Sequence, residues 1–495
     1  MARPKVPQAP TGHRGAPNYY RWLALTVAGL GTLSGTLDSS SVAIALPRLS
    51  EAFGVDPSTA LWISLVYILS SAGLLFTMGW LGDAVGRRRL YTVGFLTVSL
   101  TLGLAALSPN FGVLLLFRAL EGVGAAMIQA NSNAILAENF PPGERARAVG
   151  LQGIAVGLGM SAGPILGGVV MDYLDWRALF YLRIPISLLG AVMAWWVLRD
   201  ARMADGRARP DILGAVALFG SVGGFLLAVN QLGRVGFGSA LVWVGAAAAV
   251  VLIPTFVVLQ RRAEHPLLDL KLFSFPRFRM AILSLMGFFL AWAGIAYMAP
   301  FYLQQGLGYS AAKAGFLLAS FHVMRMVGSP ISGMLTMRLS ARTVTTLALL
   351  LTAAGLLAFS RLGTSPSLWA IVACLVAAGL GAAFFEPPNT ASILDATPRD
   401  RMGTGSAAVP AGRQIAMSSG IAATGALFAS RQTAHKAELG AAGVTGADAA
   451  HQASALAFGE ALLLSVGFTL LAMTASALRP GGRAGTGAAQ EREGA

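Results

Sequence analysis

The sequence predicts an all-α polytopic membrane protein with fourteen transmembrane helices. Hydrophobic residues make up 55% of the 495 residues and charged residues only 12%, which is about half the charge that a soluble domain carries. The mean hydropathy is +0.65. The apolar residues gather in fourteen runs, each close to the length of about 20 residues that a spanning helix needs. All fourteen are expected to be helices, because an open strand cannot satisfy its backbone hydrogen bonds in lipid.

The runs follow one another with short gaps. They begin near Trp22, Thr59, Leu90, Phe111, Arg147, Leu179, Asp211, Ser239, Met280, Ala314, Thr343, Ser367, Thr404 and Ser454. The first run is expected to remain as a helix rather than be removed as a signal peptide, because it continues to about Leu46 and many more runs follow. The longest gap, about 431–453, is rich in Ala and Gly and is expected to be an exposed loop.

The net charge of +14 does not indicate a nucleic-acid-binding protein. The charges lie in the short gaps and tails and form no basic stripe. With the N-terminus inside the cell, the cytoplasmic gaps and tails hold about three times as many Lys and Arg residues as the external gaps. We therefore expect a multi-pass protein of the cytoplasmic membrane with both termini in the cytoplasm.

An internal repeat divides the chain into two halves. The stretch 79–88 after the second run has an echo at 333–342 after the tenth, and Pro47 has a counterpart in Pro300. Six helices therefore repeat as six, and repeated bundles around a midplane site are typical of alternating-access transporters. The expected parts are a cytoplasmic tail (1–21), an N-terminal six-helix bundle (22–200), a linker with two inserted helices (201–262), a C-terminal six-helix bundle (263–478) and a second cytoplasmic tail (479–495).

Two glycine-rich motifs predict close helix packing. The first, after the second run, contains Gly79, Gly82, Asp83, Gly86, Arg87, Arg88 and Arg89. Its Asp can pair with a cation or cap a helix, and its Arg residues anchor the cytoplasmic face. The second motif, in the fifth run, contains Gly150, Gly159, Gly163, Pro164, Gly167 and Gly168. These glycines leave a helix face without side chains, and the proline bends the helix.

Charged residues inside the first and fourth runs are candidates for function, because charge within a membrane helix is expensive. Asp38 is expected to carry a proton or contact a cation, or else to be a carboxylate that the neighbouring Ser residues satisfy. Arg118 and Glu121 are three residues apart, share a helix face and are expected to pair. We hypothesise that Glu121 is an additional titrating site.

The second half carries a further set of intramembrane polar residues. Glu386, before two prolines, is expected to attract cationic drugs or carry a proton, or else to pair with Arg413 or Arg325. His322 is more typical of a hydrogen-bonded helix residue than of a proton relay, and Glu460 is a weaker candidate near the outer end of the last helix. Candidates for a substrate cavity are Trp292, Tyr297, Phe385 and Arg413, although most aromatic side chains in membrane helices pack or face lipid.

Together these motifs resemble the major facilitator superfamily and, more narrowly, its fourteen-helix drug:proton antiporters. The resemblance implies that residues 79–89 form a conformational latch, that the fifth helix has the signature of antiporters, and that Arg118 takes part in proton transfer. The sequence departs from the family pattern at three positions, with Ala43 for a usual Asn, Glu121 for a usual Gln and Arg183 for a usual Asn.

The function implied is a proton-driven antiporter that exports amphipathic drugs or antibiotics and so confers resistance. A proton-coupled importer or facilitator of a small metabolite is the alternative. No cofactor is expected, since the proton gradient supplies the energy, and the expected partners are the lipid bilayer, a small drug-like substrate and protons. The lone Cys374 excludes an intrachain disulfide framework and a Cys-based zinc site. We expect no nucleic-acid partner and no enzyme activity, and a monomer with no evident adaptor protein.

Overall fold

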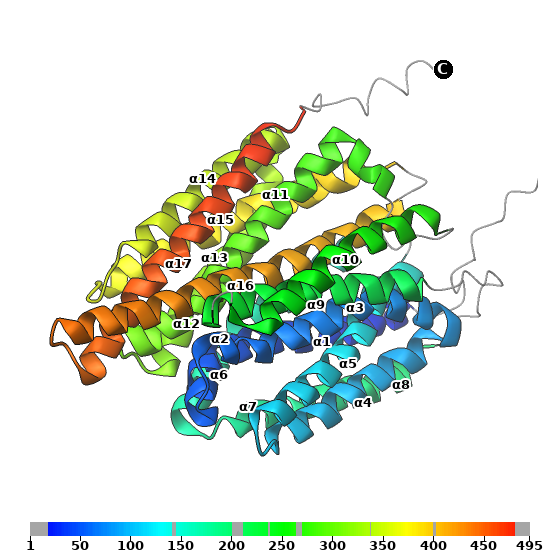
Figure 1. The fold of residues 1–495 in the computed structure, drawn as a ribbon. Coiled ribbons are helices and arrows are strands. Elements are labelled where there is room, and N and C mark those ends of the chain that lie inside the picture. The colour runs from blue at the N-terminus through cyan, green and yellow to red at the C-terminus, as the bar shows by residue number, and fades with distance from the viewer. Residues whose placement is uncertain are drawn as a thin grey trace, which may run out of the picture.

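The computed structural model describes residues 18–140, 145–199, 211–235, 238–263, 270–336, 338–398 and 402–480. Throughout these residues the regular structure is helical, and none of them forms a strand. The long helices lie side by side in an elongated bundle (Figure 1). The predicted all-α fold is confirmed.

The first half of the chain contains six long helices and two short ones. They are α1 (Asn18–Phe53), α2 (Pro57–Ala60), α3 (Trp62–Val85), α4 (Arg87–Ala106), α5 (Phe111–Asn139), α6 (Arg145–Tyr173), α7 (Arg177–Tyr181) and α8 (Ile184–Val197). α1 and α6 each run through an internal proline, Pro47 and Pro164.

The second half follows two inserted helices, α9 (Ile212–Val235) and α10 (Ala240–Arg262). Its elements are η2 (Leu270–Ser274), α11 (Pro276–Ala293), η3 (Gly294–Met298), α12 (Ala299–Phe301), η4 (Tyr302–Gly306), α13 (Ala311–Thr336), α14 (Ala341–Ser360), α15 (Leu368–Asp395), α16 (Met402–Ala441) and α17 (Gly446–Ala477). η3 and η4 are single π-helical turns. α11 to η4 therefore form one continuous helix with a π-helical turn on each side of Pro300.

The predicted helix starts agree with the observed ones to within eight residues, but one predicted loop is wrong. Residues 431–453 are mostly helical, because α16 continues to Ala441 and α17 begins at Gly446. The Ala-rich composition that suggested a loop also favours helix. Charge pairing then ties the extension of α16 to α17, since Glu460 of α17 contacts both Arg431 and His435 of α16.

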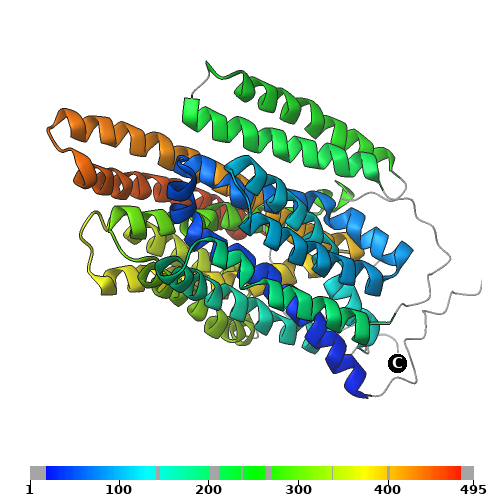
Figure 2. The same cartoon turned by 90° about the horizontal axis from the view of Figure 1, so that it is seen from below.

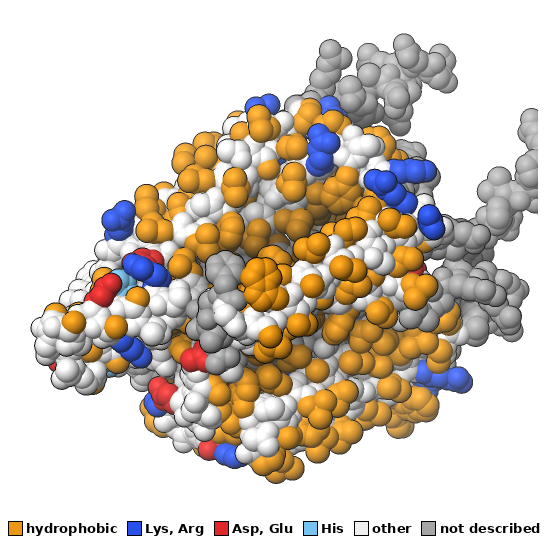
Figure 3. Space-filling model, in the orientation of Figure 1, with side chains coloured by type: hydrophobic (Ala, Val, Ile, Leu, Met, Phe, Trp, Pro, Cys, Tyr) orange, Lys and Arg blue, Asp and Glu red, His pale blue; other side chains and the backbone are white. Residues whose placement is uncertain are grey.

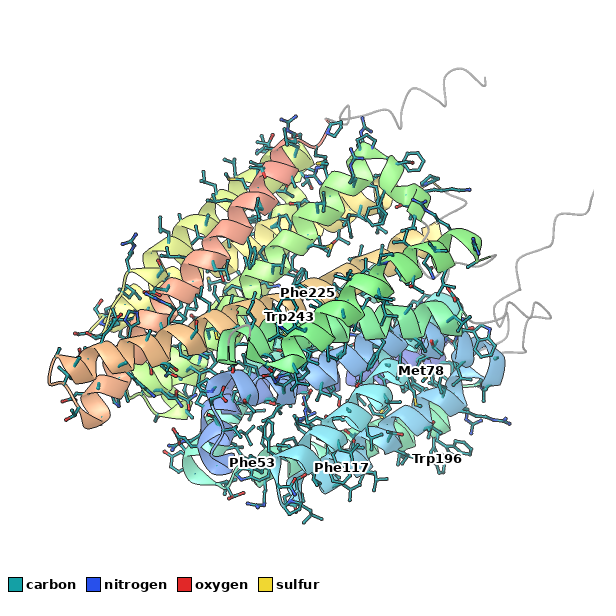
Figure 4. The ribbon with its side chains drawn as sticks, in the orientation of Figure 1. Phe53, Met78, Phe117, Trp196, Phe225 and Trp243 are labelled. Atoms are coloured by element: carbon teal, nitrogen blue, oxygen red, sulfur yellow. The ribbon has the colours of Figure 1, made fainter. Side chains whose placement is uncertain are left out.

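The helix surface fits a lipid environment. Eleven stretches of the described residues are long and apolar enough to cross a membrane. Three other long helices, α1, α9 and α16, lie alongside them, and the count of fourteen crossings stays a prediction. Hydrophobic side chains cover most of the face in Figure 3. Figure 4 marks Trp196 of α8 and Trp243 of α10 on the outside, where they are 82% and 60% exposed.

The helices of each half pack mainly with one another. In the first half α1 packs on α5, α6 and α8, and α5 packs on α3 and α4. In the second half α11, α14 and α16 each pack on α17, and α13 and α14 pack on α15. The two halves meet chiefly where α6 packs on α13. The inserted helices α9 and α10 form an outer layer (Figure 2), with α9 against both α3 and α16 at the seam between the halves.

Candidate functional site

Four charged side chains form a closed network inside the first half. Asp38 of α1 receives hydrogen bonds from Arg118 of α5 at 2.8 and 3.0 Å, and Glu121 of α5 receives one from Arg118 at 2.6 Å. Arg183 donates to Glu121 at 2.9 Å, and its Nη1 lies 2.5 Å from Asp38 Oδ1 in an ion pair without hydrogen-bond alignment. Each carboxylate therefore contacts both guanidinium groups. We call Asp38, Arg118, Glu121 and Arg183 the charge quartet.

The charge quartet is buried and electrically balanced. Asp38, Arg118 and Glu121 are 1% exposed and Arg183 is 4% exposed. Arg118 also donates from Nε to the carbonyl of Ile63 at 3.1 Å, and its guanidinium lies 4.5 Å from the centre of the Tyr67 ring. Two cations and two anions in mutual contact reduce the desolvation penalty that a lone buried charge would carry.

Local structure explains how these side chains meet. Arg118 and Glu121 lie one turn apart on α5, so the predicted pair is confirmed. Arg183 lies at the break between α7 and α8, where Pro185 occupies the first turn of α8. Since proline has no N–H to donate, it is tolerated at a helix start. The break places the Arg183 guanidinium beside α5 and α1.

Arg183 is the functional candidate that sequence reasoning missed. The sequence departs from the family pattern at Glu121 and at Arg183, 62 residues apart, and the structure joins these two side chains directly. One departure adds a negative charge and the other adds a positive charge. The two departures therefore compensate each other, and their opposite signs were the signal that could have linked them.

A cavity lies beside the charge quartet, between the two halves. Its empty space, mouth included, is about 480 Å³. From the first half it is lined by Ser39, Ser40, Ala43, Ile44, Met160 and Pro164, and from the second by Trp292, Ile295, Ala296, Tyr297, Pro300, Leu318, Phe321, His322 and Met417. Three of these residues come from the π-helical turn η3, and such turns often occur at functional sites.

Two of the four predicted cavity residues line the cavity and two do not. Trp292 and Tyr297 line the cavity. Phe385 is buried, and its ring lies against Phe288 with 4.7 Å between the ring centres. Arg413 does not line the cavity directly. It lies on α16 one turn before the lining residue Met417.

A second charged cluster lies in the other half. Arg325 of α13 donates to Glu386 of α15 at 2.5 Å, and both side chains are 17% exposed. Of the two partners considered for Glu386, the structure selects Arg325. Arg413 is close enough to interact electrostatically with both, and its guanidinium lies 5.7 Å from the centre of the Phe289 ring.

The glycine motif of α6 packs against α1. A Cβ atom at Gly163 would lie 1.8 Å from Ser40 Oγ, one at Gly159 2.0 Å from Thr36 Oγ1, and one at Gly167 2.5 Å from Ile44. Gly168 instead faces the other half, where a Cβ would lie 2.3 Å from the Ala311 carbonyl. Gly150 lies in α6, and its surroundings fall outside the described side chains.

The latch motif lies at the junction of α3 and α4. Gly86 has φ of +104°, which favours glycine, and separates the two helices. Arg87 forms an ion pair with Glu138 of α5, and Arg88 lies over the Trp195 ring at 4.3 Å. A Cβ at Gly82 would lie 1.9 Å from Asn131 Oδ1, whereas Gly79 is not crowded. The Asp83 side chain is outside the described set.

The two halves are joined beyond the cavity, where α6 ends and α13 begins. The Asp172 carboxylate of α6 accepts the backbone N–H groups of Ala311 at 2.8 Å and Ala312 at 2.9 Å. It therefore caps a helix of the other half. Gln304 donates to the Ile44 carbonyl at 2.9 Å across the same seam.

The fold and site define a polytopic membrane transporter with two helix bundles around a central cavity. The family model of the Major Facilitator Superfamily matches residues 28–421, and the chain belongs to this superfamily. It is therefore a transporter and not an enzyme.

The chain is similar to several transporters, among them drug-resistance proteins, which confirms the resemblance stated from the motifs. It is 30% identical over 422 residues to the tetracenomycin C resistance and export protein of Streptomyces glaucescens, covering 85% of this chain and 78% of that one. It is 30% identical over 416 residues to the multidrug resistance protein Stp of Mycobacterium tuberculosis, covering 83% and 76%. It is also 27% identical over 413 residues to the riboflavin transporter RibZ of Clostridioides difficile, covering 83% and 89%.

Among solved structures, the fold is similar to a bacterial homologue of the human lysosomal transporter Spinster in an inward-facing and unoccupied conformation. The TM-score is 0.67 at 16% identity, covering 94% of this chain and 98% of that one. At this identity the similarity shows the shared fold.

Proposed function

We propose that this protein is a proton-driven antiporter that exports amphipathic compounds across the cell membrane. One observation carries the proposal. Helix α1 contributes Asp38 to the buried charge quartet, and the next two residues, Ser39 and Ser40, form part of the cavity wall. A change of charge at Asp38 therefore acts directly on the element that a substrate touches.

Protonation of Asp38 would leave the charge quartet with a net positive charge. Arg118 and Arg183 would then share Glu121 as their remaining anionic partner, and the contacts of both with α1 would weaken. We infer that Asp38 carries the coupled proton, that Arg118 and Arg183 set its charge state, and that Glu121 is the second candidate for titration. Glu386 is a third carboxylate at which a proton can bind, with Arg325 as its partner.

The movement of α1 would reach the other half through α6. Ser40 Oγ donates to the Gly159 carbonyl of α6 at 3.0 Å. The glycine face of α6 lies so close to α1 that the two helices cannot slide along each other unless they first move apart. At its far end α6 holds α13 through Asp172. This chain of contacts supports an alternating-access mechanism in which loss or gain of one proton biases which end of the cavity is closed.

The cavity favours an amphipathic substrate. Aromatic and aliphatic side chains form most of its wall, and a largely apolar pocket with a few polar groups is typical of sites for drug-like molecules. The relatives named as resistance proteins support export. An inward proton-motive force supplies about 2.3 kcal/mol per charge for each 100 mV.

The distribution of charge supports cytoplasmic termini. α1 begins and α17 ends at the same end of the bundle (Figure 1). On the face in Figure 3 several Lys and Arg side chains lie at that end, whereas the Asp and Glu side chains gather toward the opposite one. Lys and Arg residues favour the cytoplasmic side of membrane proteins, so we place both termini there.

Everted membrane vesicles with an acidified interior test the proposal. We expect them to accumulate a fluorescent aromatic substrate, and nigericin, which collapses the pH gradient, to abolish the accumulation. Asp38→Asn should abolish it as well. Asp175→Asn is the matched control, because Asp175 is an exposed carboxylate paired with Arg177. Accumulation that survives nigericin would refute proton coupling.

Uptake of a metabolite is the second candidate function, favoured by the similarity to a protein named as a riboflavin transporter. The same vesicles separate the two. An importer coupled to protons would release substrate from everted vesicles when their interior is acidified, whereas an exporter would accumulate it.

A further inference from the structure

Among the described residues of the first half, the buried charged side chains pair with one another. The charge quartet holds two cations and two anions, and each carboxylate contacts both arginines. Asp38 and Glu121 are fully engaged and buried. A positively charged substrate would find no vacant carboxylate in this network.

The second half presents an excess of positive charge near the cavity. Arg325 and Glu386 neutralise each other at 2.5 Å, which leaves Arg413 as the third member of the cluster. Among the described residues Arg413 has no ion pair, and its guanidinium lies over the face of the Phe289 ring. The cluster of Arg325, Glu386 and Arg413 therefore carries a net charge of about +1.

Helix geometry places this excess charge one turn from the cavity. Arg413 and the lining residue Met417 are four residues apart on α16 and share a face. On α13 the lining residue His322 precedes Arg325 by three residues in the same way. Both arginines therefore border the same end of the cavity, Arg413 from α16 and Arg325 from α13.

The cavity wall, as far as the structure describes it, is rich in aromatic residues and carries no acid group. None of its lining residues is Asp or Glu. Trp292 lies against Phe321 with ring centres 6.3 Å apart and against His322 at 6.2 Å. The buried Nδ1 of His322 has no hydrogen-bond partner in the described structure. Such a wall suits flat rings that carry at least one polar substituent.

We propose that the substrate is an aromatic acid: a planar, multi-ring compound with a carboxylate or phenolate group. Its rings lie among Trp292, Phe321 and Tyr297, its acid group turns toward Arg413 one helical turn beyond the cavity wall, and His322 Nδ1 is available to a second polar group. Its affinity exceeds that of a cation on the same ring system, because the cation meets a positive cluster. The assignment of this site to a transported substrate rests on the proposed export function, but the binding preference does not.

Two dyes with one ring system test the proposal. Fluorescein and rhodamine 123 share a three-ring xanthene core, but fluorescein is an anion and rhodamine 123 a cation. Fluorescence anisotropy with the purified full-length protein measures the binding of each. We expect fluorescein to bind at least about tenfold more tightly, as for a charge that gains a desolvated partner. Rhodamine 123 binding as tightly or more tightly, or no binding of either dye, would overturn the proposal.

Substitutions of Arg413 locate the preference. Arg413→Gln should weaken fluorescein binding about tenfold, Arg413→Lys should retain part of it, and Arg413→Glu should reverse the order of the two dyes. Arg431→Gln is the matched control, because Arg431 lies on the same helix but pairs with Glu460. An unchanged preference in Arg413→Glu would refute the role of Arg413. Preferential fluorescein binding without proton-driven transport would instead count against the proposed function alone.

Discussion

The charge quartet makes a quantitative prediction about two positions that are 62 residues apart. Glu121 and Arg183 contact each other at 2.9 Å, and each is also paired with another member of the quartet. We consider Glu121→Gln, Arg183→Asn and the double variant, which together replace the added charges by the amides of the family pattern.

The expected effects follow from the buried charge that each variant leaves. Arg183→Asn removes a cation from both carboxylates and leaves a net charge of about −1, at a cost of about 4 kcal/mol in unfolding free energy. Glu121→Gln keeps an acceptor oxygen for the arginines and should cost about 2 kcal/mol. The double variant restores neutrality and should cost about 3 kcal/mol, not the sum of about 6. The coupling energy is therefore about 3 kcal/mol.

Thermal unfolding of the purified proteins, followed by the fluorescence of the nine Trp residues, measures this cycle. The double variant should have a higher melting temperature than Arg183→Asn alone. The exposed pair Asp175–Arg177 supplies a control cycle, in which each change should stay within about 1 kcal/mol. Strictly additive shifts at Glu121 and Arg183, or an Arg183→Asn protein as stable as the unsubstituted one, would refute the reasoning.

Three further predictions concern the contacts between helices. Asp172→Ala removes the cap on α13, which is worth about 1 kcal/mol. The population of molecules in which the end of α6 has separated from the start of α13 should therefore rise about fivefold. Spin-label distances across the seam, measured after Cys374→Ser, check this, and an unchanged distribution would contradict it. Gly163→Ala should destabilise the protein by about 1–3 kcal/mol and impair transport because its Cβ meets Ser40. Gly153 is the control, because a Cβ at this position meets open space. Gly153→Ala should leave both the melting temperature and the transport rate unchanged, and equal effects of the two substitutions would refute the packing argument. Arg87→Gln breaks the pair with Glu138 and should lower the transport rate while dye affinity stays constant; a parallel loss of affinity would exclude a purely conformational latch.

The length and apolar composition of the runs predict a large part of this structure. The fourteen apolar runs coincide with long helices because length and composition are local properties of the sequence. The pairing of Arg118 with Glu121 is equally local, since three residues on a helix fix their proximity. The loop predicted at 431–453 is wrong because contacts between residues that are distant in the sequence decide the structure there. The extension of α16 beyond its apolar run is supported by contacts of Arg431 and His435 with Glu460 of α17, which is 29 and 25 residues away in the sequence.

The candidate site could not be predicted in full, because it depends on how helices that are distant in the sequence pack together. Asp38, Arg118 and Arg183 come from α1, α5 and the break before α8, so their meeting depends on how three helices pack. The partner of Glu386 was a choice between two arginines that only the packing of α13 on α15 decides. The π-helical turn at Gly294–Met298, which contributes Tyr297 to the cavity, lies just before Pro300, which has no N–H to donate to the preceding turn. The proline is visible in the sequence, but the residues at which the π-helical turn forms are not.

Proton flux in proteoliposomes tests the central claim most directly. The purified protein is reconstituted with a pH-sensitive dye inside, a gradient of aromatic substrate is imposed, and proton and substrate fluxes are recorded together. We expect protons to move opposite to the substrate, and both coupled fluxes to be lost in Asp38→Asn, with Asp38→Glu retaining part of them and both variants melting as folded proteins. Substrate flux without an opposing proton flux, or coupling that persists in Asp38→Asn, would contradict the assignment of Asp38 and the antiport mechanism built on it.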